Sequence, residues 1–326
     1  MKKNGNLHNA KTAKNDEFYT LLSTIDRELG NYRNGIKNHF EGKVLYLPCD
    51  RIDLENPRNS SMFFWHFWEL FKVYGLKKLI VTSYNKGGHG QKYVTEVGVT
   101  DHIPIGGKLN FVPEELEGDG DFRSEECMKL MKECDIVCTN PPFSLFRDFI
   151  AQVVEFGKEF LVIGNMNAIT YKEIFPLIKE NKMWLGVSWP KEFMTPDGTI
   201  QKFGNTCWFT NLDHKRRHDG VIPTECYDPE KYPHYDNYDA IEVSKTNYIP
   251  KDWKGVMGVP ISFLDKYDPD MFEILDARDC TNVESLKKKS TFLIKDKDGT
   301  INGKPTYARI LIRNKRPIKS NEYYII

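Results

Sequence analysis

The sequence predicts an α/β protein with a doubly wound sheet, followed by a smaller C-terminal region that contains β-strands. Short apolar runs typical of buried strands alternate with helical patterns between residues 44 and 210. Such strands belong to parallel sheets that helices cover on both faces. After about residue 213 the alternation gives way to Tyr-, Asp- and Pro-rich sequence. Because 326 residues exceed the usual size of one domain, we expect a first domain at residues 1–213 and a second region at residues 214–326.

The individual elements follow from the spacing of apolar residues. An amphipathic helix is predicted from residue 16 to residue 29, with its cap at Asn15 or Asp16. Further helices are predicted at 62–68, with Ser60 or Ser61 as the cap, and at 124–132, 145–156 and 171–180. Strands are predicted at 44–48, 78–82, 135–138, 160–163, 183–187, 206–210, 255–263, 290–294 and 307–312, with a turn at Asp298-Gly299.

Composition points to a soluble protein. The mean hydropathy is −0.54 and no apolar stretch approaches the length of a membrane span. The basic start Met1–Asn6 leads into no apolar segment of the kind that directs export, so we expect a cytoplasmic protein with no membrane partner. Seven scattered cysteines lack any C-x-x-C pair, and eight histidines show no ligand spacing. We therefore expect reduced thiols and no metal site.

The charge is zero overall but unevenly distributed. Residues 101–140 hold ten acidic and four basic side chains, whereas residues 285–326 hold eleven basic and three acidic ones. The first fourteen residues add four lysines and no acid, and 213–218 form another basic cluster. Any one run is explained equally well as a solvated face. Three basic segments together favour a polyanionic partner.

The strongest chemical signal is Thr139-Asn140-Pro141-Pro142-Phe143, which directly follows a predicted strand and precedes a helix. Doubly wound sheets bind ligands beyond the carboxyl ends of their strands. Two prolines stiffen the turn, so the Asn140 side chain and the Pro141 carbonyl become two fixed hydrogen-bond acceptors. Acceptors that hold both N–H groups of an aromatic amine, such as adenine N6, draw the nitrogen toward a tetrahedral shape and free its lone pair for attack. The simpler alternative is a strand-to-helix turn with a capping Asn.

In this setting the chain resembles the class I N6-adenine DNA methyltransferases, and most closely the EcoRI-type family. The resemblance extends from about residue 8 to residue 316. Asn-Pro-Pro-Phe alone also occurs in methyltransferases that act on RNA or on protein glutamine, so the whole series of segments carries the resemblance. The segments are Asp16–Thr20, Gly118–Ser124, Thr139–Arg147, Ile169–Glu173, Lys179–Lys182 and Gly255–Pro260.

The resemblance implies a Rossmann-like class I methyltransferase sheet with S-adenosylmethionine as methyl donor. It also implies that Asn140, Pro141, Pro142 and Phe143 form the catalytic element, with Phe143 stacked on the target base. Stacking on a base taken out of the duplex offsets part of the unstacking cost of a few kcal/mol. Trp208 and Phe209 resemble the aromatic segment on the other face of that base, although core packing explains them equally well.

The same resemblance implies cofactor-binding residues. Asp121 and Phe122 match the acid–aromatic step that holds the cofactor adenine, where a carboxylate accepts from N6 and an aromatic ring packs on the base. Asp119 is an alternative for the acid, and a plain polar turn is the competing interpretation of the loop. Tyr19 and Thr20 match the element close to the methionine moiety.

Two departures from the family pattern affect the remaining cofactor contacts. The first strand leads into Cys49-Asp50 and not into a Gly-x-Gly loop, so Asp50 is the candidate for one contact. The next strand ends in Ser83-Tyr84-Asn85, where class I enzymes usually place an acid for the ribose hydroxyls. Gly87–Gly90 is better explained as a mobile loop than as a phosphate cradle, because no strand–loop–helix context supports one.

Base flipping requires a grip on flanking phosphates. The candidates are Lys11 and Lys14 in the N-terminal arm, Lys215, Arg216 and Arg217, and the basic C-terminal segment. Residues 214–326 are the natural place for base readout. The sequence thus predicts a site-specific enzyme acting on adenine in double-stranded DNA, with a cognate restriction endonuclease as a possible partner in the same system. A methyltransferase for RNA or protein glutamine, or a DNA-binding module without catalysis, is the alternative.

Overall fold

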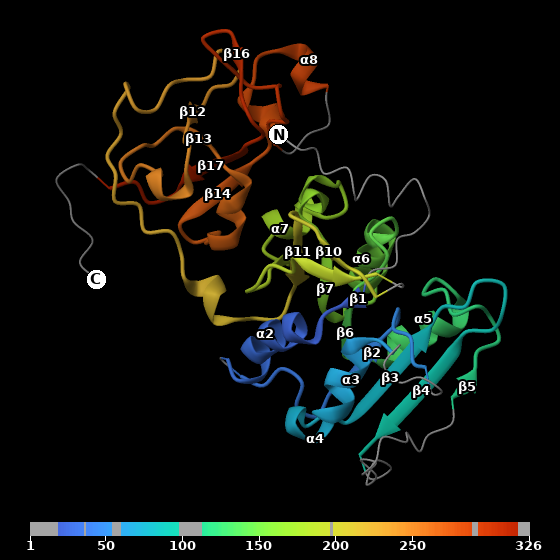
Figure 1. Ribbon diagram of the computed structural model, residues 1–326. Helices are drawn as coiled ribbons and strands as arrows, with labels where there is room; N and C mark the ends of the chain where they lie inside the picture. Colours follow the sequence, from blue (N-terminus) through green and yellow to red (C-terminus); the bar gives the residue numbers. More distant parts are fainter. Residues whose placement is uncertain are drawn as a thin grey trace. The chain divides into compact units, whose positions relative to one another are not determined.

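The part of the chain up to Thr210 is built on an eight-stranded mixed sheet (Figure 1). The structure is a computed structural model, and it describes residues 19–35, 37–53, 60–97, 113–195, 198–288 and 293–318. The strands lie side by side in the order β5 (Glu114–Glu115), β4 (Gln91–Glu96), β3 (Lys78–Ser83), β2 (Val44–Leu47), β6 (Ile136–Thr139), β7 (Glu159–Asn165), β11 (Thr206–Thr210) and β8 (Trp184–Leu185).

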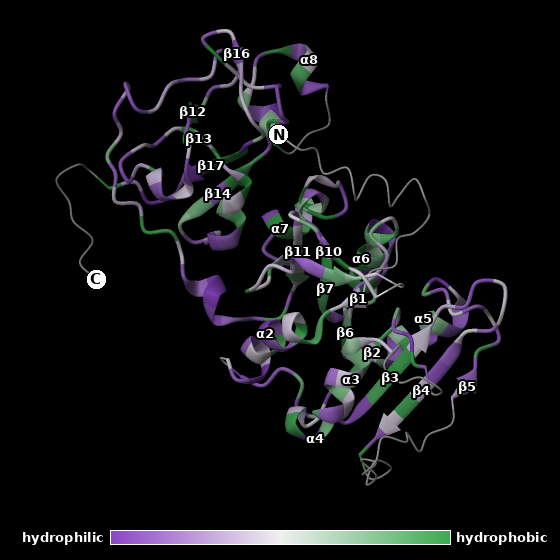
Figure 2. Ribbon diagram, viewed as in Figure 1, coloured by the Kyte–Doolittle hydropathy of each residue, from purple (hydrophilic) through white to green (hydrophobic). Residues whose placement is uncertain are grey.

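Only the middle of this sheet is parallel. Strands β3, β2, β6 and β7 run parallel, whereas β4 is antiparallel to β3, β5 to β4, and β11 to β7. The prediction of a parallel sheet is therefore wrong at its edges. Parallel neighbours need a crossover of about a dozen residues or more, and the loop 84–90 is too short for one. The chain instead returns as a hairpin, and Figure 2 shows the more hydrophilic character of β4 beside β3.

Helices pack on both faces of the sheet, as predicted. One face is contacted by α2 (Leu22–Arg33), α3 (Met62–Glu69) and α4 (Phe71–Tyr74). The strand residues buried with them alternate along each strand, because successive side chains point to opposite faces: Leu45, Leu47, Leu79, Val81, Ile136, Cys138, Leu161, Ile163 and Trp208. Helices α5 (Glu125–Glu133) and α6 (Phe146–Glu155) contact β2 and β7, with Phe146 packed on Phe209 of the opposite face.

The N-terminal helix begins later than the sequence predicts. Tyr19–Thr20 form strand β1, and α2 starts at Leu22 with no side-chain cap. Strand β1 pairs with β9 (Glu192–Met194), which pairs in turn with β10 (Ile200–Lys202). This long-range pairing outweighs the helical spacing of the apolar residues. The predicted cap residues, Asn15 and Asp16, lie outside the described residues.

Other helix predictions are confirmed or corrected by local contacts. The Ser61 hydroxyl accepts from the backbone N–H of Phe63 and caps α3. The His66 ring, a predicted core histidine, lies 2.6 Å from the Tyr74 hydroxyl. The helix predicted at 171–180 is shorter than expected. The 3-10 helix η2 (Met166–Thr170) precedes it, and α7 covers only Phe175–Lys179.

Contacts divide the chain into two units. The first contains the described residues up to Ile174 together with Leu185–Lys215, and the second contains Phe175–Trp184 and the residues from Arg216 onward. The chain crosses between the units three times, and the last crossing, after Lys215, lies close to the expected boundary at residue 213. The segment Phe175–Trp184, however, lies within the predicted first domain and packs with the second unit.

The second unit is built on a four-stranded sheet in the order β12 (Ile241–Glu242), β13 (Val256–Val259), β17 (Ile310–Asn314) and β14 (Phe272–Leu275). A hairpin joins β15 (Thr300–Ile301) to β16 (Lys304–Pro305). The remaining helical turns of the chain are η3 (Lys215–His218), η4 (Thr246–Tyr248), η5 (Ile261–Lys266), η6 (Ala277–Cys280) and α8 (Glu284–Lys287).

Two turns lie where the sequence predicts one. A turn at 296–298 overlaps the predicted Asp298-Gly299 position. The hairpin itself closes at Asn302-Gly303, whose φ angles of +51° and +72° fit a type I′ turn. Both backbone N–H groups donate to the Asp236 carboxylate, which lowers the pKa of Asp236. The strand predicted at 290–294 falls mostly outside the described residues, although Ile294 forms a bridge with Arg309.

No helix in the described ranges is long and apolar enough to cross a membrane. The seven cysteines are free thiols.

A buried ion pair joins the strands of the second unit. The Arg309 Nε donates to Glu242 at 2.9 Å, and the two side chains are only 11% and 12% exposed. The Tyr235 hydroxyl donates to the same carboxylate. In contrast, the pair of Arg313 with Glu273 on the same sheet is about half exposed.

We predict that Arg309→Ala lowers the free energy of unfolding by about 3 kcal/mol or more, because it leaves the Glu242 charge buried without its cation. Arg313→Ala is the matched control and should cost less than about 1 kcal/mol, since exposed pairs contribute little. Denaturant unfolding of both variants measures the difference. Equal losses would show that burial does not govern the strength of the Arg309 pair.

Candidate active site

Polar residues gather at the carboxyl edge of the parallel strands. Asp50 follows β2, Ser83 ends β3 and Asn140 follows β6. Strands β2, β3 and β6 are parallel neighbours, so their carboxyl ends lie at the same edge. This is the edge at which open α/β sheets bind ligands.

Asp50 links three elements at this edge. Its carboxylate accepts from the Ser61 hydroxyl at the start of α3 and from the Thr139 hydroxyl, 3.0 Å away at the end of β6. Its backbone N–H donates to the carbonyl of Thr82 in β3 at 3.1 Å. Asp50 is 3% exposed, and burial raises its pKa to about 6, against the opposing effect of the two hydroxyl donors.

The turn after β6 places Asn140 at the sheet edge, as predicted. Asn140 is half-buried and Pro141 is buried. The backbone N–H of Leu145 donates to the Pro142 carbonyl at 2.9 Å and closes the turn before α6 begins at Phe146. The two prolines hold φ near −65°, so this turn is stiff where it follows the last residue of the strand.

A three-stranded sheet of β1, β9 and β10 packs against this turn. The Phe143 ring lies edge-to-face on Phe193 of β9, with centroids 6.4 Å apart, and Thr20 of β1 pairs with the same Phe193. Thr20, Phe143 and Phe193 are distant in the sequence but adjacent in the structure. The Thr20 hydroxyl oxygen is buried and has no hydrogen-bond partner among the described residues. Phe143 is 6% exposed, so its ring would have to move to stack on a base.

The loop that contains Asp119 and Asp121 packs on the end of β3. The backbone N–H of Asn85 donates to the Asp119 carbonyl at 2.8 Å. Gly120 has a φ of +82°, and a Cβ at this position would overlap the carbonyl oxygen of Ser83. The loop therefore reaches β3 because residue 120 is a glycine.

The two acids of this loop have different surroundings. Asp121 accepts from Arg123 through both Nε, at 2.9 Å, and a terminal nitrogen, at 2.6 Å, which holds the pKa of Asp121 below its usual range. Asp119 accepts from the backbone N–H of Asp121 at 3.0 Å, and no ion pair of Asp119 is found in the described parts of the chain. Asp119, the alternative acid of the sequence analysis, therefore has more capacity left to accept from a ligand.

Phe122 packs into the core and does not present a ring face to solvent. It is 3% exposed, and its ring contacts Phe149 in a T-shaped arrangement with centroids 5.1 Å apart. The Gln152 side chain donates to its carbonyl at 2.9 Å. These contacts give Phe122 a structural role in holding α6 against the loop.

Trp208 and Phe209 cannot both stack on one base. Neither has exposed area, and as consecutive residues of β11 they point to opposite faces of the sheet. Trp208 contacts Phe63 of α3, whereas Phe209 contacts Phe146 of α6. These contacts favour the core-packing alternative over the prediction that both residues stack on the target base.

Most of the predicted basic cluster has partners within the protein. Arg216 forms an ion pair with Asp265, and the Arg217 guanidinium lies 3.5 Å from the centroid of the Trp184 ring. Of the three, Lys215 is exposed, whereas Arg216 and Arg217 are half-buried. Lys11 and Lys14 lie outside the described residues.

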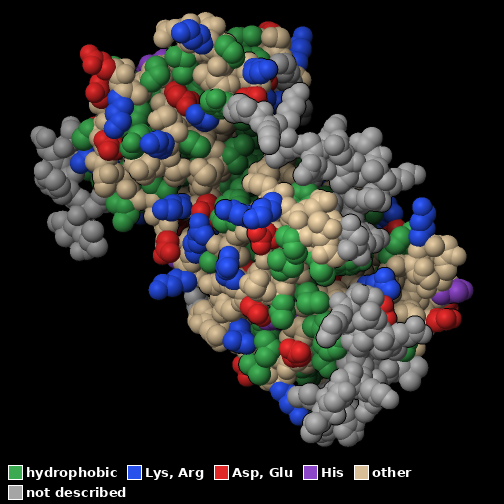
Figure 3. All heavy atoms as spheres, viewed as in Figure 1, with side chains coloured by type: hydrophobic (Ala, Val, Ile, Leu, Met, Phe, Trp, Pro, Cys, Tyr) green, Lys and Arg blue, Asp and Glu red, His purple; other side chains and the backbone are tan. Residues whose placement is uncertain are grey.

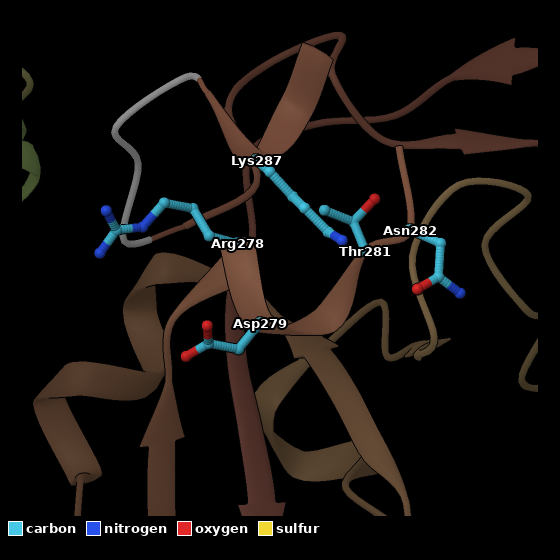
Figure 4. Close-up of a pocket in the computed structure, with 5 residues that line it drawn as sticks. All are labelled: Arg278, Asp279, Thr281, Asn282 and Lys287. Carbon is cyan, nitrogen blue, oxygen red and sulfur yellow. The ribbon is translucent and has the colours of Figure 1, made fainter. Parts of the chain in front are cut away.

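A separate depression of about 500 Å³ lies in the second unit (Figure 4). Arg278, Asp279, Thr281, Asn282 and Lys287 line it. Arg278 is held by a forked ion pair with Asp276, and Figure 4 shows Arg278 and Asn282 pointing in opposite directions. Arg278 and Asn282 therefore do not converge on one ligand position.

In the described part of the chain, no group of three or more His, Cys, Asp or Glu side chains could hold a metal ion.

Sequence reasoning missed the residues that support the turn. Thr139 and Ser61 hold Asp50, and Phe193 packs on Phe143. One signal was available for Thr139, which is the polar residue in the otherwise apolar strand Ile136–Thr139. No comparable signal marks Phe193, because its contact depends on a distant strand pairing.

The structure thus has an Asn-Pro-Pro-Phe turn at the carboxyl edge of a mixed α/β sheet, and the comparisons with known proteins give the class, a DNA methyltransferase. Over residues 6–315 the chain matches the family described as "Adenine-specific methyltransferase EcoRI" and belongs to it. It is 44% identical to Type II methyltransferase M.EcoRI of Escherichia coli, over 95% of this chain and 96% of that protein.

Two mycoplasma proteins are also similar. The chain is 35% identical to Type II methyltransferase M.MgeORF184P of Mycoplasma genitalium, over 94% of this chain and 98% of that protein. It is 35% identical to Type II methyltransferase M.MpnI of Mycoplasma pneumoniae, over 95% and 98%. No solved structure matches the chain. Membership of the family makes this chain an adenine-specific methyltransferase.

We predict that Gly120→Ala destabilises the fold by about 2 kcal/mol or more, because an alanine at a left-handed φ is strained and its Cβ meets the Ser83 carbonyl. Gly118→Ala is the control two residues earlier, where a Cβ meets nothing within 4 Å. Thermal or denaturant unfolding compares the two. A Gly120→Ala variant as stable as Gly118→Ala would disprove the close packing of the loop on β3.

Proposed function

We propose that this chain transfers a methyl group from S-adenosylmethionine to adenine N6 at a specific site in duplex DNA. The observation that carries the proposal is the Asn140-Pro141 turn, presented at the carboxyl edge of β6 in a chain that belongs to an adenine-specific methyltransferase family. The sheet order, with four parallel strands and an antiparallel β11 beside β7, supports a Rossmann-like class I methyltransferase fold.

The chemistry follows from two acceptors on one stiff turn. The N6 lone pair of adenine is delocalised into the ring and is a poor nucleophile. The Asn140 carboxamide oxygen and the Pro141 carbonyl oxygen accept from the two N–H groups and favour a tetrahedral nitrogen. S-adenosylmethionine, when bound, supplies an electrophilic methyl group. Phe143 stacks on the extruded base once its ring has moved from its buried position beside Phe193, and this offsets part of the unstacking cost.

The residues at the sheet edge fit the cofactor. The buried Thr20 hydroxyl, which has no hydrogen-bond partner among the residues that the structure describes, suits a polar group of the methionine moiety, and Tyr19 precedes it on the same strand. The Asp119 carboxylate, in the loop that packs on the end of β3, suits the adenine amino group, because the Asp121 carboxylate already accepts from Arg123. Phe122 supports this loop from within the core.

The second unit is the proposed DNA-recognition region. Lys215, the last residue of the first unit, supplies an exposed cation directly before it in sequence, and the N-terminal lysines Lys11 and Lys14 are further candidates for phosphate contacts. Arg216 and Arg217 stabilise the unit through Asp265 and Trp184. Figure 3 shows Lys and Arg side chains interspersed with acidic ones on the visible face, so individual cations rather than one uniform surface would contact phosphates.

The relatives named Type II methyltransferases support a role in restriction–modification. A cognate endonuclease that cuts the unmethylated site is the proposed functional partner, with no stable complex implied. A methyltransferase for RNA or protein glutamine is less well supported, because the full-length relatives and the family are not of that type. A module without catalysis is disfavoured by the intact Asn140–Phe143 element.

We predict that the purified chain transfers labelled methyl from S-adenosylmethionine to adenine in duplex DNA and that Asn140→Ala abolishes turnover, because one acceptor for N6 is lost. Cofactor binding should survive, since Asn140 contacts the target amine. Methyl transfer to DNA, RNA and protein is measured in parallel, with calorimetry for the cofactor. Label in RNA or protein but not in DNA, or turnover in Asn140→Ala equal to that of the wild type, contradicts the proposal.

We predict that Lys215→Ala weakens DNA binding and reduces the slope of log K against log salt by about 1, as expected for one lost phosphate contact. Lys129→Ala is the control, because Lys129 pairs with Glu125 in the acidic part of the first unit. Binding titrations at several salt concentrations give both slopes. An unchanged slope for Lys215→Ala removes this side chain from the interface.

A further inference from the structure

The carboxylate of Asp50 has a place in the site that the sequence does not indicate. Both of its oxygens are engaged by protein hydroxyls, Oδ1 by Ser61 and Oδ2 by Thr139. We propose that Asp50 is a positioning residue, which fixes Thr139 and through it the Asn140-Pro141 turn, rather than a ligand of the cofactor. This inference rests on the proposed function.

The first step of the argument is the adjacency of Thr139 and Asn140. Thr139 is the last residue of β6 and shares a peptide bond with Asn140. Its hydroxyl donates to Asp50 at 3.0 Å, and the Thr139 side chain is fully buried. Any rotation of Thr139 therefore changes the direction of the Asn140 backbone, and a misplacement of about 1 Å at a reacting centre costs about 100-fold in rate.

The second step is that Asp50 is itself held from two other directions. Its backbone N–H donates to Thr82 of β3. Ser61, the hydroxyl partner of its Oδ1, also caps α3 by accepting from the N–H of Phe63. Through Asp50, the position of Thr139 is therefore fixed relative to β2, β3 and α3. A ligand contact would have to use the remaining lone pairs of these oxygens, and Asp50 is only 3% exposed.

The third step concerns protonation. Two hydroxyl donors require an acceptor on each oxygen, which only the ionised carboxylate provides without rearrangement. Burial raises the pKa of Asp50 to about 6. The titratable neighbours of Asp50 in the described residues are the thiols of Cys49 and Cys138, and burial raises the pKa of both, so they stay neutral. Turnover should therefore fall as the pH drops through about 6.

Stability and activity should respond to this proton in opposite directions. The folded pKa of about 6 lies above the ordinary value of 3.8, so the folded chain binds the proton more tightly than the unfolded chain. Holding the ionised form costs stability above pH about 6, and protonation relieves that cost. When Asp50 is protonated at low pH, turnover therefore falls, but this protonation does not lower the folding stability.

The test compares three variants of the full-length enzyme acting on duplex DNA. Asp50→Asn replaces one acceptor oxygen by a donor, Thr139→Val removes the hydroxyl with little change of shape, and Thr139→Ser keeps it. We expect kcat to fall by about 100-fold in Asp50→Asn and Thr139→Val, with the KM for S-adenosylmethionine nearly unchanged. Thr139→Ser should restore most of the turnover lost in Thr139→Val. The acid limb near pH 6 should be present in the wild type and absent in Asp50→Asn.

Several outcomes would overturn the inference. A raised KM for S-adenosylmethionine with unchanged kcat in Asp50→Asn would make Asp50 a cofactor ligand. A wild-type kcat in Thr139→Val would show that the Thr139 hydroxyl does not position the Asn140-Pro141 turn. A kcat loss that disappears after normalisation to the cofactor-binding fraction would show a structural role alone. If Asp50→Asn does not fold, Thr139→Val and the wild-type pH profile still decide. Failure of the proposed function is distinct, because the wild type would then transfer no methyl to DNA.

Discussion

The hydrogen bond from the Thr139 hydroxyl to the buried Asp50 carboxylate joins the carboxyl ends of two parallel strands. A charge in this position is unfavourable unless its oxygens are satisfied, and Ser61 completes that requirement from α3. The strand ends are therefore held in register by side chains as well as by the backbone ladder. The stiff Asn140-Pro141 turn directly follows Thr139. The orientation of the Asn140 carboxamide and the Pro141 carbonyl is therefore defined by this hydrogen bond.

Much of the central fold was predictable because burial on both faces leaves a local trace. The apolar runs at β2, β3, β6, β7 and β11 are continuous, and the helices between them show a clear periodicity. Strand β4 was missed because Gln91–Glu96 is largely polar and is a strand only through its pairing with β3. Strand β1 was assigned to a helix because its partner, β9, lies far along the chain.

The candidate site could be located from the sequence where its residues are consecutive. The Asn140–Phe143 turn has its chemistry and its rigidity in the same few positions. The loop at Asp119–Phe122 was located, but the sequence could not show that Arg123 occupies one acid and leaves the other. Trp208 and Phe209 are aromatic, as a stacking site requires, yet alternation along β11 sends them to opposite core layers.

The chain passes between its two units at Ile174, at Leu185 and again after Lys215. The second unit is consequently assembled from two separate stretches of sequence, fastened to each other by the stacking of Arg217 on Trp184 and by the Arg217 bond to Asn181. Modular exchange among relatives must respect this discontinuity. A chimera that takes only the residues after about 213 from a relative would place the relative's residue 217 against the Trp184 of this chain. A chimera that also takes the relative's segment corresponding to Phe175–Trp184 would keep both partners of this contact from the same protein.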